Sequence, residues 1–223
     1  MEAMVKKYQQ KFRKVKEEMQ RWEELQSRLI SQFSNASPII QRLQMIEDKK
    51  HYGILRDVDG VEQAVLRKQL ESLETVMLSI NMTMKDFRGM VILLEKMVRD
   101  GRQIAKGGSQ LSAKQLNQRV GVKPSLSDCL DGLTILHEMH NSEYLLKTSV
   151  VSALSKIALK PSVTDLGTLC QLLVDQPNIL TDEDGIPMLI GFSMKNWNHC
   201  QSNLMWADPD IDNFNPECAV RRG

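Results

Sequence analysis

The sequence has few aromatic residues and few glycines, and neither sign of charge dominates. Aromatic residues make up 5% of the 223 residues, and the chain holds 12 glycines but 13 methionines, a composition that favours helices over sheets. The formal net charge is +1, from 29 basic and 28 acidic residues, so no global positive field would recruit nucleic acid or a membrane surface. The composition therefore excludes a binder that depends on overall charge.

Cysteines and long apolar runs are also scarce. The four cysteines are scattered and form no C-x-x-C pair, so neither a disulfide framework nor a zinc ribbon is indicated. No stretch reaches the roughly 20 apolar residues of a membrane helix, and the first residues lack the apolar run of a secretory signal. We therefore expect reduced thiols, a location in the cytoplasm or nucleus, and no membrane contact.

No catalytic or cofactor motif can be identified. The segment HEMH at 137–140 is one residue short of the H-E-x-x-H zinc motif, and no third ligand is marked. We interpret His137 and His140 as partly exposed side chains beside a helical seam; a small metal-dependent enzyme that uses both is the remote alternative. The segment KGGS at 106–109 lacks the strand and the spacing of a phosphate loop, and it indicates a helix stop. The sequence thus predicts no enzyme, no metal and no cofactor.

Three long segments carry the apolar periodicity of an α-helix. In the first, apolar residues recur about every 3.6 residues from Met4 to Leu29 and again after Pro38. Proline lacks a backbone N–H and crowds the preceding turn. The sequence therefore predicts a kink or a break near Ser37 and then helix to about Lys50.

The clearest periodicity lies between Leu66 and Val98, where apolar residues are separated by alternating gaps of four and three. This spacing predicts one helix over 61–104. At 1.5 Å per residue this helix is about 65 Å long, too long to be buried in a compact globule. A third long helix is predicted over 125–158 and a short one over 162–174.

Together these segments predict an all-α fold, an elongated antiparallel helical bundle of three long helices plus short helices over residues 1–178. Residues 51–60 have turn composition and should reverse the chain between the first two long helices. Residues 179–223 show neither a helical nor a strand period, so we expect an irregular, poorly ordered C-terminal tail.

The first predicted helix carries a basic cluster that could contact RNA phosphates, made of Lys6, Lys7, Lys11, Arg13, Lys14 and Lys16. Four glutamates follow it, and Tyr8 and Phe12 fall on the apolar stripe, so these rings are not free to stack on bases. A solvated helix face is the preferred interpretation. No sequence-specific nucleic-acid binding is expected.

From about residue 34 to residue 154 the order of features resembles the AIRIM family, small helical ribosome-maturation factors that interact with AFG-type AAA ATPases. The similarity includes Pro38 and the segment LRKQL at 66–70. It also includes a Pro-Ser-x-x-Asp-x-Leu-x-x-Leu pattern from Pro124, followed by Tyr144 and a leucine. In the family a similar pattern opens the last long helix.

The resemblance implies a non-enzymatic adaptor subunit of an AAA ATPase complex that supports late maturation of the large ribosomal subunit. It implies AAA ATPases, the pre-ribosomal large subunit and other helical subunits as partners, in the cytoplasm and the nucleus. Lys68, Asp128 and Tyr144 fall at matching positions and are the candidate partner-binding residues. The sequence departs from the family pattern at residues 181–185.

The helical pattern also permits a different binding module, a coiled-coil subunit of a cytoskeletal, kinetochore or tethering assembly. Self-association through the seam from Leu66 to Val98 would favour this alternative. A monomer whose first and third helices cover the seam would favour the adaptor.

Overall fold

The computed structural model describes residues 2–46, 49–106, 112–119, 125–157 and 163–179. These residues form the helices α1 (Glu2–Ile46), α2 (Val61–Lys106), α3 (Ala113–Leu116), α4 (Leu126–Ile157) and α5 (Val163–Asp175), with a 3-10 segment, η1 (Lys49–Asp57), between α1 and α2. No strand occurs in this part of the chain. The predicted all-α class is therefore confirmed.

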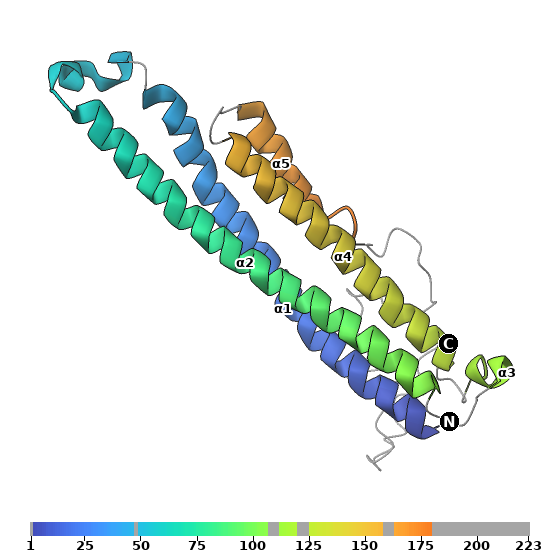
Figure 1. Cartoon of the computed structure of the whole chain (residues 1–223). Coiled ribbons are helices and arrows are strands. Elements are labelled where there is room, and N and C mark those ends of the chain that lie inside the picture. The colour runs from blue at the N-terminus through green and yellow to red at the C-terminus, as the bar shows by residue number, and fades with distance from the viewer. Residues whose placement is uncertain (1, 47–48, 107–111, 120–124, 158–162, 180–223) are drawn as a thin grey trace, which may run out of the picture.

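The helices form an elongated antiparallel bundle around one long hairpin (Figure 1). Helices α1 and α2 are the two arms of the hairpin, and α4 runs along α2 in the opposite direction. Helix α5 lies beside the second half of α4 and also contacts α1. The end of the hairpin that carries η1 projects beyond α4 and α5, so among the described residues this end consists of η1 and the two hairpin arms.

Helix α1 continues through Pro38 as far as Ile46, so a break near Ser37 does not occur. Pro38 has no N–H to donate to the carbonyl of Ser34, but residues on both sides of it pack into the same core, including Phe33 and Ile40. This packing outweighs the cost of a proline inside a helix, which is about 3 kcal/mol from the lost hydrogen bond and the crowding of the preceding turn.

The bundle contains two apolar clusters, one after the other along its length. The first joins α1, α2 and α4, and its central residues are Tyr8, Phe12, Leu94, Val98, Cys129 and Leu133. The second adds α5, and its central residues are Phe33, Ile40, Ile80, Phe87, Leu154 and Leu173. Each cluster is made from residues spaced three or four apart on each helix, as expected for helices that bury one stripe each.

Gly101 of α2 lets three helices approach closely within the first cluster. The Tyr8 hydroxyl donates a hydrogen bond of 2.7 Å to the Gly101 carbonyl, and a Cβ added at Gly101 would lie 3.3 Å from side-chain atoms of both Tyr8 and Leu133. Burial raises the pKa of Tyr8 to about 12, because its ionised form would lie in an apolar environment. Tyr8 therefore remains a neutral hydrogen-bond donor.

The chain reverses between α1 and α2 through η1 and a turn, as its composition predicts. Gly53 and Gly60 have φ angles of 51° and 81°, values that residues with a side chain rarely adopt. The Tyr52 hydroxyl donates to the carbonyl of Ile46 at 2.9 Å, which ties η1 to the end of α1.

The other predicted helices are close to those observed. The prediction of 61–104 corresponds to α2, 125–158 to α4 and 162–174 to α5. Residues 180–223 lie outside the described residues, so the division into a bundle over 1–178 and an irregular tail over 179–223 remains a prediction.

Candidate interaction surfaces

A fully buried polar cluster on α4 contains His140, Glu143 and Lys147. The Lys147 ammonium donates to Glu143 Oε1 at 2.7 Å, and it lies 5.8 Å and 5.7 Å from the ring centroids of Trp22 and Phe87. This arrangement compensates the buried lysine charge with one carboxylate and two aromatic faces. Burial nevertheless lowers the pKa of Lys147, because it disfavours the charged form.

The histidine of this cluster packs against an aromatic ring and not against solvent. The His140 and Trp22 rings meet edge to face with centroids 4.6 Å apart, and His140 Nδ1 lies 2.7 Å from the carbonyl of Leu136. Burial lowers the pKa of His140 to about 4, partly opposed by this hydrogen bond. The expectation that His140 is partly exposed was therefore wrong; His137 is half-buried.

The second carboxylate oxygen of Glu143 holds the segment after α5. The backbone amide and the side-chain amide of Asn178 both donate to Glu143 Oε2, at 3.2 Å and 3.1 Å. On α1, Trp22 Nε1 donates to Gln176 Oε1 at 2.9 Å, and the Gln26 amide donates to the Leu173 carbonyl. The buried polar cluster thus fastens the C-terminal end of the described chain to α1 and α4.

The polar cluster is closed to solvent, so its arrangement indicates a structural role. All three side chains have no exposed surface, and a substrate could not reach them without opening the bundle. Among the described residues, no three His, Cys, Asp or Glu side chains gather as metal ligands. The Cys129 thiol is buried in the apolar core, and this burial raises its pKa to about 12, so it is a poor nucleophile.

The projecting end of the hairpin exposes large apolar side chains. We call this surface the hairpin tip; it consists of Met45, Ile54, Leu55, Val58, Val65, Leu66 and Leu70. Ile54 is 94% exposed and Leu70 48% exposed. Several large exposed apolar side chains at one end of a folded protein commonly mark a site of interaction.

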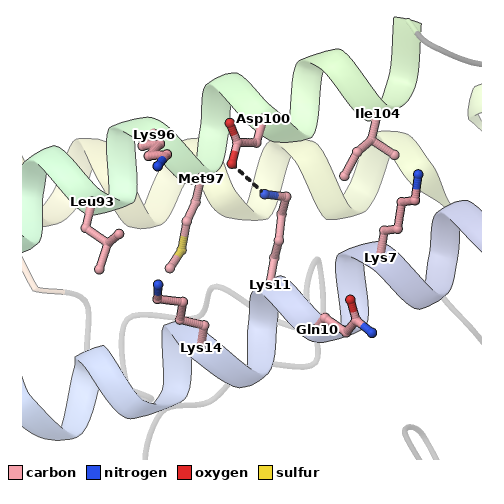
Figure 2. Close-up of a pocket in the computed structure, with 9 residues that line it drawn as sticks. All are labelled: Lys7, Gln10, Lys11, Lys14, Leu93, Lys96, Met97, Asp100 and Ile104. Carbon is pink, nitrogen blue, oxygen red and sulfur yellow. Dashed lines mark hydrogen bonds and ion pairs between the residues drawn. The ribbon is translucent and has the colours of Figure 1, made fainter.

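At the opposite end of the hairpin, a groove of about 400 Å³ lies between the first turns of α1 and the last turns of α2. We call it the lysine groove because Lys7, Lys11, Lys14 and Lys96 line it. Figure 2 shows the side chains of Lys7, Lys11 and Lys14 extending from α1 towards α2, which carries Lys96. Three of these lysines belong to the basic cluster identified in the sequence, and the fold adds the fourth from α2.

One carboxylate, Asp100, partly balances the lysine groove. Lys11 Nζ lies 3.0 Å from Asp100 Oδ2, and this hydrogen bond is the main cause that lowers the pKa of Asp100. No carboxylate of the described residues pairs with Lys7, Lys14 or Lys96. The groove therefore has a net positive charge.

The three candidate partner-binding residues lie far apart. Lys68 is exposed near the hairpin tip, and Tyr144 is half-buried against the second apolar cluster. Asp128 caps α4: its carboxylate accepts from the Ser125 amide at 3.0 Å, and its own amide donates to the Ser125 hydroxyl at 3.1 Å. This reciprocal pair is a capping box, so helix capping accounts for the Pro-Ser-x-x-Asp pattern. The structure does not bring the three residues into one site.

The sequence interpretation missed the buried polar cluster. The helix predicted over 125–158 rests on an apolar stripe that breaks off at Met139 and resumes at Val150, and the polar residues between them were not assigned to the core. The buried face of α4 continues through this gap at the same spacing of three and four, via residues 140, 143 and 147. The unbroken spacing was the signal that these polar residues lie in the core.

These features define an all-α protein with an exposed apolar surface and a basic groove at opposite ends of a long hairpin. A family model of C1orf109-like ribosome biogenesis proteins matches residues 2–186, and the chain belongs to this family. This is the AIRIM family, so the resemblance is confirmed, and the match extends on both sides of the stretch that suggested it. No curated protein sequence matches the chain significantly.

Family membership establishes that the chain is a ribosome biogenesis protein. The matched range includes residues 181–185, where the sequence departs from the expected helical pattern, and it ends directly afterwards. None of the described helices is long and apolar enough to cross a membrane.

Proposed function

We propose that this protein is a non-enzymatic adaptor subunit of an AAA ATPase complex that supports late maturation of the large ribosomal subunit. Nucleotide hydrolysis in the ATPase would supply the work, and this chain would supply recognition and position. We place the protein in the cytoplasm and the nucleus, with AAA ATPases, large-subunit precursors and other helical subunits as its partners. The resemblance to the AIRIM family supports the choice of ATPase and of ribosomal subunit.

The observation that carries the proposal is the hairpin tip. Its seven large apolar side chains remain exposed although the rest of the apolar stripe on α1 and α2 is buried. The tip is formed by the ends of two helices and by η1, which the hydrogen bond from Tyr52 to Ile46 ties to α1. Apolar surface that none of the described residues covers is suited to a protein partner.

The burial of the long seam supports an adaptor over a self-associating coiled coil. From Leu73 to Val98, the seam residues of α2 are buried beneath α1 and α4 or lie half-buried against the core. Only Leu66 and Leu70, at the start of the seam, are exposed. The surface left for pairing between copies is therefore short, whereas a stable two-stranded coiled coil uses several heptads.

Lys68 adds a charged contact beside this apolar surface. Lys68 is exposed and follows Val65 by three residues in α2, so it shares a helix face with that residue of the hairpin tip. Interfaces commonly have an apolar centre and a charged rim. We propose that Lys68 contacts the partner there, while Asp128 and Tyr144 act elsewhere or through the fold.

The test compares two triple variants of the full chain expressed in cells with an affinity tag. Ile54→Gln, Leu66→Gln and Leu70→Gln change the hairpin tip. Leu78→Gln, Met82→Gln and Ile92→Gln change exposed apolar residues on the outer face of α2 and form the matched control. The wild type and the control should recover an AAA ATPase and large-subunit precursors, and the tip variant should recover at least tenfold less ATPase.

Two results would reject the proposal. In one, the wild-type protein recovers neither an AAA ATPase nor large-subunit precursors. In the other, the tip variant and the control lose the ATPase equally although both keep the wild-type circular dichroism and melting temperature.

A further inference from the structure

The lysine groove combines positive charge with a defined shape. Lys7, Lys11 and Lys14 are spaced i, i+4 and i+7, so they share one face of α1 and span about 10 Å along its axis. Lys96 faces them from α2 across the groove (Figure 2). The four ammonium groups thus surround a space and are not dispersed around a helix, which differs from the solvated face favoured by the sequence alone.

The neighbouring sequence extends this positive field. Residues 2–16 and 93–106, which form the two walls and their flanks, hold ten basic and three acidic side chains, whereas the whole chain has a net charge of +1. The charge of this protein is therefore concentrated at one end of the hairpin. A local field of this kind attracts a polyanion even when the overall charge is near zero.

The groove has the chemistry to contact phosphates but not to read bases. The two aromatic residues of this part of α1, Tyr8 and Phe12, are buried in the first apolar cluster, so no ring is available on which a base could stack. The lining residues contain no arginine, so the planar fork that suits carboxylates is missing. Lysines act on phosphate oxygens as point charges with three rotatable donors.

We infer that the lysine groove binds the phosphate backbone of double-stranded RNA without reading its sequence. The choice of RNA rests on membership of a ribosome biogenesis family and does not depend on the proposed ATPase adaptor role. Double-stranded RNA presents its phosphates in a regular array and is recognised largely by backbone and shape. Lys7, Lys14 and Lys96 contact phosphates directly, whereas the ammonium of Lys11 remains paired with Asp100.

The first test measures binding of the full chain to a 20-base-pair RNA duplex between 50 and 200 mM salt. The groove variant carries Lys7→Gln, Lys14→Gln and Lys96→Gln. The control removes the same charge from exposed lysines outside the groove through Lys85→Gln, Lys114→Gln and Lys156→Gln. The groove variant should bind at least tenfold more weakly at 50 mM salt, and its slope of log affinity against log salt should be shallower by about 3.

The control variant should lose no more than about threefold in affinity, because charge outside the groove contributes only to the diffuse field. Equal losses in the two variants would overturn the inference, and so would a wild-type protein that does not bind the duplex. All six lysines are exposed, so both variants should keep the wild-type melting temperature.

A second variant changes affinity in the opposite direction. Asp100→Asn removes the carboxylate that pairs with Lys11, which frees a fourth ammonium and removes a negative charge from the groove. RNA affinity should rise about threefold at 50 mM salt. A fall in affinity would contradict the inference, because no loss of positive charge accompanies this substitution.

Two competitors distinguish RNA from other polyanions. A DNA duplex of the same sequence and a 20-residue polyglutamate peptide are each added to the RNA complex, and RNA should remain the preferred ligand. More effective competition by DNA or by the peptide would overturn the assignment to RNA. Recovery of the AAA ATPase by the groove variant is scored in parallel, so the failure of one proposal is distinguishable from the failure of the other.

Discussion

The two ends of the α1–α2 hairpin are built from the same two helices and differ in what covers them. At the end near Tyr8 and Gly101, α4 completes a three-helix core, and the outer surface is strongly basic. At the hairpin tip none of the other described long helices accompanies α1 and α2 (Figure 1), and residues 39–72 contain six basic and six acidic side chains. The apolar periodicity is continuous between the two ends, so it shows where a helix can pack but not what it packs against.

The largest expected effect tests the covered part of the hairpin. Glu143→Ala should lower the free energy of unfolding by about 3–5 kcal/mol, because it leaves the Lys147 ammonium buried without its carboxylate. It also removes both hydrogen bonds from Asn178. Denaturant unfolding followed by circular dichroism measures the change.

The double variant Glu143→Ala with Lys147→Met is the control for this prediction. Methionine removes the unpaired charge and keeps most of the apolar contact with Trp22 and Phe87, so a large part of the stability should return. If the double variant were as unstable as Glu143→Ala alone, the charge pair would not be the cause.

The next prediction compares two leucines of the same seam directly. Leu94 is 1% exposed under α4, and Leu70 is 48% exposed at the hairpin tip. Leu94→Ala should destabilise the protein by about 3 kcal/mol, because it leaves a cavity, whereas Leu70→Ala should cost less than about 1 kcal/mol. Equal losses of stability would mean that the hairpin tip is covered in solution and that the two ends do not differ.

A third prediction uses pH to separate the two ends. His140 has its pKa lowered to about 4 by burial, whereas the unfolded chain has the ordinary value of about 6.5. Between these values the unfolded state binds more protons, so stability is complete above pH 6.5 and falls as the pH falls towards 4. Lowering the pH from 7 to 5 should cost about 2 kcal/mol through this group.

His140→Leu is the matched variant for the pH series, because leucine fills a similar volume and does not titrate. Glu143, Lys147 and His137 also affect the pKa of His140. The free energy of unfolding of the variant is therefore compared with that of the wild type at each pH. A wild-type slope that persists in His140→Leu would assign the pH dependence to other groups. The hairpin tip contains no group of this kind among its seven residues.

The smallest expected effect compares two glycines of α2. A Cβ at Gly101 would lie 3.3 Å from Tyr8 and Leu133, whereas a Cβ at Gly89 would meet nothing within 4 Å. Gly101→Val should destabilise the protein by about 1 kcal/mol or more through overpacking, and Gly89→Val should change stability by less than about 0.5 kcal/mol. Thermal melting measures both, and an equal response would contradict the close approach of α4 to Gly101.

Much of the fold could be predicted because helix period is a local property. The spacing from Leu66 to Val98 places α2 almost to the residue, and the composition of residues 51–60 predicts the reversal. Which element covers each part of the seam is not a local property: Leu70 and Leu94 belong to the same seam, but α4 runs antiparallel to α2 and ends at Ile157, so it covers Leu94 and leaves Leu70 exposed.

The candidate surfaces were less predictable, because each joins residues distant in sequence. The basic cluster on α1 was visible, but Lys96, which closes the lysine groove, lies more than 80 residues away. His140 was interpreted as partly exposed and Lys147 was not assigned to the core, because a polar residue in an amphipathic pattern is ordinarily solvated. Their burial depends on Trp22 and Phe87, which other helices supply.

Helix α2 runs without interruption from the hairpin tip to the lysine groove. From Leu66 to Lys96 it rises about 45 Å, so it fixes the distance between the hairpin tip and the lysine groove. Ligands held at the two ends would not collide, and their distance would be set by the number of helical turns. A partner bound at one of these surfaces would therefore lie at a fixed distance from a ligand bound at the other.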